Sequence, residues 1–203
     1  KYCLECHDFG GKGAAKVVLA GDKDMFFNAS YTHLWRQGYV GSIGAGLAPI
    51  QAPRSWGSHA SKLVSLLRQG HENVELDPDS LERVITWVDI NAPYYPSYYS
   101  AYPDHPGGRS PLDDVQVRRL GELTGIDFGR EGTFSTSSGP WVSFDRPEMS
   151  PCLEKLKATQ AAYDEALAII RAGQAMLAQR PRADMPGFHP CETDQVRERR
   201  YVR

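Results

Sequence analysis

The side chains with the clearest chemistry lie near the start of the chain, where Cys3, Cys6 and His7 form the pattern Cys-x-x-Cys-His. This spacing is typical of a site that attaches haem c covalently. Two thiols three positions apart lie on one side of a helical turn, so both can form thioethers to the vinyl groups of one porphyrin. The adjacent imidazole can then bind the iron as proximal ligand. We therefore predict one covalently attached haem c at these three residues.

Two other uses of paired cysteines stay open. A thioredoxin-like redox pair sits at a helix start after a strand, and nothing ahead of Cys3 supplies that strand. A zinc site needs a second Cys or His pair at ligand spacing, whereas Cys152 and Cys191 are isolated and distant.

Cys152 and Cys191 are expected to form a disulfide with each other. Haem c is attached outside the cytoplasm in bacteria, and that compartment also permits disulfides. The bridge would close a loop of about 40 residues and contribute about 3–4 kcal/mol to stability in the chain-entropy model. The alternative is two buried free thiols. The same reasoning predicts a periplasmic or extracellular protein, with its signal peptide outside this sequence and the chain itself a fragment of a larger protein.

The composition of the chain argues against two classes of protein, nucleic-acid binders and membrane-spanning proteins. The chain has 203 residues, of which 41% are hydrophobic, and a formal net charge of −2. Such a chain can fill a core of ordinary size, and it lacks the basic excess of a nucleic-acid binder. No apolar run approaches the roughly 20 residues that span a bilayer. We expect no nucleic-acid partner and no membrane span in this chain.

The elements that must position the haem are predicted to be helices. A short helix with one apolar face is expected to end at Gly70, and a second to begin with Asp77 as N-cap and Pro78 as its first residue. The second helix closes at Asn91-Ala92-Pro93. Its one-sided apolar stripe has spacing i, i+3, i+4 and i+7 and consists of Leu81, Val84, Ile85 and Val88.

The C-terminal half is expected to extend this domain. Residues 93–150 are rich in Pro, Gly, Tyr and Ser and predict irregular structure, followed by a long helix over 152–180 and a charged surface segment over 191–203 tied back by Cys191. The fold class is mostly α: a loop-rich, cytochrome c-like haem domain over 1–110, with a loop and long-helix extension over 111–203 packed on it as one structural unit.

Four segments together resemble a known haem c domain. They are the Cys-x-x-Cys-His motif, Gly57-Ser58-His59-Ala60-Ser61-Lys62-Leu63, Gly70-His71-Glu72-Asn73-Val74, and Thr86-Trp87-Val88-Asp89-Ile90-Asn91-Ala92-Pro93-Tyr94-Tyr95. The chain is similar here to the C-terminal domain of large secreted planctomycete and verrucomicrobial proteins that resemble the hydrazine synthase alpha subunit. The resemblance implies an extracytoplasmic monohaem cytochrome domain, often fused to a propeller or a carbohydrate-active or lectin-like module. It does not imply hydrazine chemistry, which needs a further haem site and partner subunits.

The second axial ligand decides the function, because a closed iron passes electrons whereas an open one binds small molecules. His71 is the first candidate, since a Gly-His pair sits at the matching place in the resembling domains. The alternatives are His59, Met149, Met185 and Met25, or an open position. Trp87 lies beside the apolar stripe, where it could pack on a porphyrin edge or serve as a core aromatic.

Three functions follow from these possibilities. The first is electron transfer with a fused or partner oxidoreductase. The second is an enzyme or gas-binding domain with an open distal face, for which Tyr31 and His33 are available. The third is a carbohydrate-binding surface made by the tyrosines between Tyr94 and Tyr102, with Tyr98 and Tyr99 as test positions.

Overall fold

The computed structural model describes residues 2–41, 43, 50–130 and 139–201. The chain divides into two compact units, one made of Lys1–Ala20 and Ser30–Pro93 and the other of Gly21–Ala29 and Tyr94–Arg203. The described part is mostly helical and contains no β-strand element, only two isolated bridges. The predicted mostly α class is thus confirmed.

The boundary between the units differs from the predicted one at residue 110. The first unit ends at Pro93, and the short segment Gly21–Ala29 belongs to the second unit. The reason is burial, because Met25 and Phe26 lie in the core of the second unit. The Tyr95 hydroxyl also donates a hydrogen bond to the Phe26 carbonyl.

The helices of the first unit follow local signals in the sequence. They are α1 (Leu4–His7), α2 (Ala29–Arg36), the 3-10 turn η1 (Gly57–His59), α3 (Lys62–Gln69) and α4 (Pro78–Asp89). The Asp77 carboxylate accepts a hydrogen bond from the Ser80 backbone N–H at 2.8 Å, and Pro78 is the first residue of α4. Gly70 ends α3 with a φ of +82°, which glycine adopts without steric cost. Both predicted helices are confirmed.

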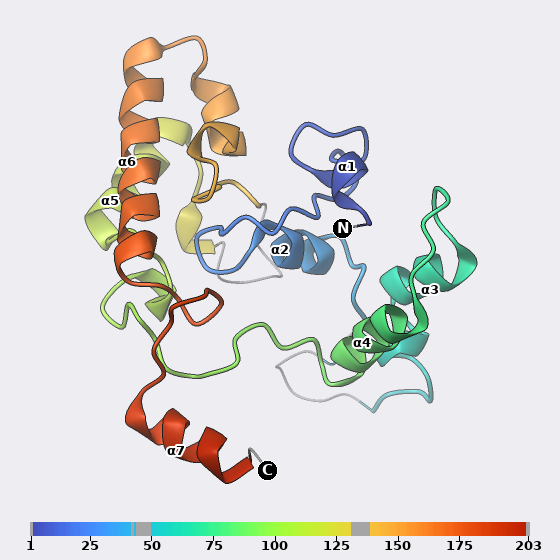
Figure 1. Cartoon of the computed structure of the whole chain (residues 1–203). Coiled ribbons are helices and arrows are strands. Elements are labelled where there is room, and N and C mark those ends of the chain that lie inside the picture. The colour runs from blue at the N-terminus through green and yellow to red at the C-terminus, as the bar shows by residue number, and fades with distance from the viewer. Residues whose placement is uncertain (1, 42, 44–49, 131–138, 202–203) are drawn as a thin grey trace. The chain divides into compact units, whose positions relative to one another are not determined.

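The core of the first unit is small. Helices α3 and α4 contact each other (Figure 1). Each buries one side chain fully, Val64 on α3 and Val88 on α4. The rest of the predicted stripe on α4, Leu81, Val84 and Ile85, stays partly exposed. These helices therefore form from local signals and carry apolar surface that the described chain covers only in part.

The second unit holds the larger helices. Its elements are η2 (Pro106–Gly108), α5 (Asp114–Thr124), η3 (Phe128–Arg130), η4 (Pro147–Met149), η5 (Pro151–Leu156), α6 (Gln160–Gln179) and α7 (Glu192–Tyr201). Helix α5 lies where irregular structure was predicted. It begins with a capping box, in which the side chains of Asp113 and Gln116 each accept a hydrogen bond from the other residue's backbone N–H.

The predicted helix over 152–180 begins later than expected, at Gln160. The preceding residues form the 3-10 turn η5, in which Leu153 and Leu156 recur at the three-residue period of that helix and are both buried. Helices α5 and α6 pack together over a core that contains Leu120 and Ile170 (Figure 1). This unit is well packed.

A buried cation fastens segment 21–29 to the second unit. The Arg182 guanidinium is 1% exposed and donates hydrogen bonds to the carbonyls of Asp24, Met25 and Phe27. It also pairs with the Asp184 carboxylate at 3.1 Å. These bonds satisfy a charge that burial would otherwise penalise heavily.

Cys152 and Cys191 are both free thiols in the structure, and the disulfide between them stays a prediction. Cys152 is fully buried in η5, ahead of the 20-residue helix α6. Cys191 comes after the far end of that helix and precedes α7. Helix α6 thus lies between the two cysteines in the chain. Burial raises the pKa of Cys152 to about 12.

Candidate haem-binding site

The paired cysteines lie at the short helix α1, Cys3 as its N-cap residue and Cys6 within it. The Cys3 carbonyl accepts hydrogen bonds from the backbone N–H of Cys6 at 3.3 Å and of His7 at 3.0 Å, so the three residues share one turn. Both thiols are partly exposed. Burial raises the pKa of the Cys3 thiol. A redox pair needs the opposite shift, because its attacking cysteine is activated as a thiolate. The direction of the shift at Cys3 is therefore not the one that activates a redox cysteine.

The loop after α1 fixes the His7 ring. A Cβ at Gly13 would lie 2.6 Å from His7 Cε1, so only glycine permits this close approach. His7 Nδ1 is 2.8 Å from the Val17 carbonyl oxygen. Because a carbonyl only accepts, Nδ1 carries the proton, and Nε2 presents its lone pair. This is the tautomer that a metal-binding histidine requires.

His71 lies in a tight turn just after α3. Its carbonyl accepts a hydrogen bond from the Val74 N–H at 2.8 Å, and the two central residues, Glu72 and Asn73, have φ values of +52° and +61°. Asparagine tolerates this left-handed region, whereas glutamate pays about 1 kcal/mol to enter it. A strained turn therefore holds the backbone of His71.

The His7 and His71 rings come together. Their centroids are 6.1 Å apart with an angle of 37° between the ring planes. Two imidazoles on opposite sides of one metal ion have centroids about 6 Å apart, since each bond is about 2 Å and each nitrogen lies about 1 Å from its ring centre. With two thiols on the same helix as His7, the residues present fit the ligand set of a haem c.

Apolar side chains accompany this pair within the first unit. Leu63, Val84 and Ile85 pack against its core yet remain partly exposed. Trp87 joins an aromatic group, with its ring 6.1 Å from that of Tyr31, and its indole N–H donates to the Pro93 carbonyl at 2.9 Å. Trp87 thus packs, partly buried, against the core of the first unit. Its contact with a porphyrin stays a prediction.

Sequence reasoning missed the function of Asp89. Its carboxylate accepts hydrogen bonds from the Ser58 N–H at 2.7 Å and the Ser58 hydroxyl at 3.0 Å. Gly57, at a φ of +67°, leaves room for this carboxylate, which would lie 2.6 Å from a Cβ there. This contact could have been predicted, because Ser58 and Asp89 both lie in the segments that resemble the known haem c domain.

The alternative axial ligands have other environments. His59 is exposed at the end of η1. Met25 is 1% exposed in the core of the second unit, where its sulfur accepts the Ser110 hydroxyl at 3.2 Å. Met149 is 41% exposed in η4, and Met185 packs against the core of the second unit. His59 belongs to the same unit as His7, and among the interactions of the described residues it shows no ring contact with His7; the three methionines belong to the second unit and stay predictions.

Tyr31 and His33, the residues predicted to serve an open distal face, make hydrogen bonds to the backbone. His33 is 6% exposed, and its Nδ1 accepts the Val18 N–H at 2.8 Å. Burial, together with the charge of Arg36, lowers the pKa of His33 to about 4. Tyr31 donates to the Ala92 carbonyl at 2.8 Å, and burial raises its pKa to about 12. Neither side chain is poised as an acid or base near neutral pH.

The predicted aromatic surface is only partly a surface. Tyr94, Tyr95 and Tyr102 turn inward, donating to Asp184, the Phe26 carbonyl and the Arg180 carbonyl respectively. Tyr98 is 97% exposed and Tyr99 is 40% exposed.

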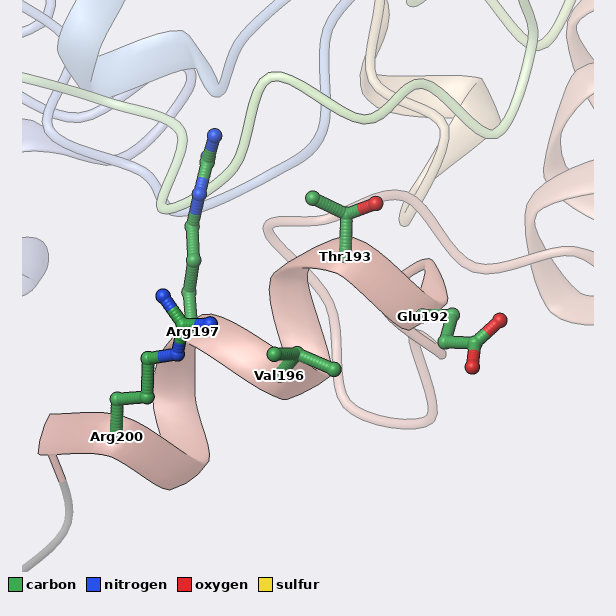
Figure 2. A pocket seen from close by; sticks show the side chains of 5 residues that line it. All are labelled: Glu192, Thr193, Val196, Arg197 and Arg200. Carbon is green, nitrogen blue, oxygen red and sulfur yellow. The ribbon is translucent and has the colours of Figure 1, made fainter.

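Tyr98 lines a groove of about 240 Å³ in the second unit together with Pro96, Ser97, Phe188, Pro190, Asp194, Arg197 and Glu198. Figure 2 shows a different hollow, of about 330 Å³, whose five lining side chains all come from the exposed helix α7. Because it joins no separate segments, this second hollow is a surface feature of one helix.

No helix in residues 2–41, 50–130 and 139–201 is long and apolar enough to cross a membrane. In the same part of the chain, no three His, Cys, Asp or Glu side chains gather as a metal-binding group. The sequence matches no protein-family model, and neither a curated protein nor a solved structure was found to match the chain.

Proposed function

We propose that this chain is a monohaem c-type cytochrome domain that passes electrons to or from a fused or partner oxidoreductase. The observation that carries the proposal is the 6.1 Å separation of the His7 and His71 rings. The Cys-x-x-Cys-His sequence on α1 supports it independently, because that motif is typical of covalent haem attachment.

Each residue has a distinct role in the proposed site. Cys3 and Cys6 would form the two thioethers, and His7 and His71 would hold the iron. A bound haem supplies one-electron exchange between ferric and ferrous iron. With both histidines bound to it, no coordination position would be open for a substrate, which favours electron transfer over catalysis.

The hydrogen bond from His7 Nδ1 to Val17 orients the ring and raises its basicity as a ligand. Two imidazole ligands give a lower reduction potential than one imidazole and one thioether, because the thioether favours ferrous iron. Covalent haem attachment and the family resemblance together support a periplasmic or extracellular location.

The absorption spectrum of protein made in a host that exports and matures c-type cytochromes tests this proposal. We expect sharp bands in the dithionite-reduced protein that carbon monoxide does not shift. A His71→Ala variant should bind carbon monoxide, whereas the matched His59→Ala variant should behave like wild type. Absence of haem bands would remove the proposal, and a carbon monoxide shift in wild-type protein would favour the open-site function.

Carbohydrate binding is a second candidate, favoured by the exposed ring of Tyr98 above the groove of the second unit. The Arg109 guanidinium holds this loop, donating to the carbonyls of Ser97, Tyr98 and Tyr99 at 2.7–3.3 Å. Affinity electrophoresis in soluble xylan and β-glucan tests it. Retardation lost in Tyr98→Ala and kept in Val115→Ala, an exposed apolar residue on α5, would support it; migration unchanged by either polymer would remove it.

A further inference from the structure

One peptide group in the first unit lies between two histidine rings. The carbonyl of Val17 is 2.8 Å from His7 Nδ1, and the N–H of Val18 is 2.8 Å from His33 Nδ1. The carbonyl and the N–H belong to the same peptide bond. A continuous hydrogen-bonded path therefore runs from His7 through the backbone to His33.

The direction of each hydrogen bond is fixed by the backbone. A carbonyl accepts and a peptide N–H donates, so His7 Nδ1 is protonated and His33 Nδ1 is an unprotonated acceptor. His33 consequently carries its proton on Nε2, and the Gln37 side-chain amide, whose nitrogen lies 3.2 Å away, accepts a hydrogen bond from it when the amide is turned to present its oxygen. Both hydrogen bonds between His7 and His33 therefore donate in the same direction, from His7 toward His33.

We infer that His33 is a positioning residue that tunes the iron bound at His7 by polarising the peptide group between Val17 and Val18. This inference rests on the proposed haem function. When a peptide N–H donates, its carbonyl becomes a better acceptor, and hydrogen bonds in such a chain strengthen one another by about 10–30%. A stronger acceptor at Nδ1 makes the His7 imidazole more electron-rich and stabilises ferric over ferrous iron.

The surroundings of His33 suit this role. The ring is 6% exposed, so water does not compete for its Nδ1. Burial disfavours the protonated ring, which keeps Nδ1 available as an acceptor at neutral pH. The adjacent positive charge of Arg36 acts in the same direction.

Spectroelectrochemical titration of the holoprotein tests the inference with two matched variants. His33→Leu removes the acceptor, whereas His33→Asn retains one, because its Oδ1 takes the place of Nδ1. We expect His33→Leu to shift the ferrous-to-ferric ratio at a fixed applied potential about twofold toward ferrous iron. His33→Asn should stay within error of wild type.

A second readout separates tuning from loss of structure. In the diamagnetic ferrous state, the His7 Nδ1 proton resonance should move upfield in His33→Leu and stay in place in His33→Asn. If His33→Leu does not fold, His33→Gln replaces it, because its longer side chain places the acceptor away from the Nδ1 position. Unchanged potential and unchanged resonance in a variant with normal haem bands would overturn the inference, whereas missing haem bands in wild type would overturn the proposed function instead.

Discussion

The helices of the two units bury apolar side chains to different extents. In the second unit, α5 and α6 pack over Leu120, Phe144 and Ile170, all of them almost fully buried. The approach is so close that a Cβ at Gly173 would lie 2.4 Å from the Phe144 ring. In the first unit, α3 and α4 each bury a single side chain fully, and α1 buries none.

Under the proposed function, this difference indicates that a prosthetic group would bind to the first unit. The second unit has a dense core of its own, of the kind that a well-packed protein interior shows. The first unit combines a paired His7 and His71 with half-exposed apolar side chains on α3 and α4. A porphyrin supplies apolar surface and takes two axial imidazoles, so a haem would complete the first unit and is not needed by the second.

The largest expected effect comes from removing the attachment thiols. In the Cys3→Ser, Cys6→Ser double variant we expect complete loss of covalent haem. Because the apolar surface of the first unit then stays uncovered, amide hydrogen exchange should speed up in α1, α3 and α4 and stay unchanged in α5 and α6. Cys191→Ser, in the second unit, is the control. Covalent haem in the double variant, or loss of protection in both units alike, would break the comparison.

A large effect confined to the second unit is expected from Arg182→Met. The change leaves the Asp184 carboxylate without its cationic partner, and removing one member of a buried ion pair costs about 3–5 kcal/mol. Urea denaturation followed by far-UV circular dichroism measures this cost. The control, Arg119→Met, breaks an exposed pair with Glu165 and should change stability little. Equal effects of the two variants would show that the Arg182 contacts do not fasten the second unit.

Gly13→Ala should disturb the first unit alone. Its new Cβ would lie 2.6 Å from the His7 ring, and such overpacking costs about 1–3 kcal/mol. The shifted ring should also change the absorption spectrum of the bound haem. Gly21→Ala is the matched control, because no atom lies within 4 Å of a Cβ there. An unaltered spectrum and stability in Gly13→Ala would mean that the His7 ring is not held by this loop.

A similar effect on stability is expected from lowering the pH. The pKa of His33 falls to about 4 on folding, so the unfolded chain binds a proton at a higher pH than the folded one. The resulting stability is fully present above about pH 6.5 and is lost as the pH falls toward 4, by about 3 kcal/mol. Denaturation at pH 7, 5.5 and 4 should show this loss in wild type and a smaller one in His33→Asn. The same pH dependence in both proteins would contradict it.

Local signals made part of the fold predictable. The Asp77 cap, Pro78 and Gly70 specify where α3 and α4 begin and end, because each acts within a few residues. The capping box of Asp113 and Gln116 was equally local, yet the surrounding Pro, Gly and Tyr suggested irregular structure, and α5 was missed. The helix predicted over 152–180 begins only at Gln160, because Pro151–Leu156 form a 3-10 turn.

Contacts between distant segments were not predictable from spacing. The membership of Gly21–Ala29 in the second unit depends on Arg182, whose carbonyl partners are about 155 residues away in sequence. His71 was predicted as the partner of His7 because it follows the Gly70 helix end and matches a Gly-His pair of the resembling domains, with His59 and three methionines as alternatives. The path from His7 to His33 runs through a backbone group, which no side-chain pattern reveals.

The central claim is that His7 and His71 bind one iron from its two faces. Near-infrared magnetic circular dichroism of the ferric wild-type protein tests it most directly, because the charge-transfer band reports the pair of axial ligands. We predict the band position typical of two imidazoles, replaced in His71→Ala by that of a high-spin iron with one imidazole. A band typical of imidazole and thioether in wild type, or a band unaffected by His71→Ala, would contradict the account.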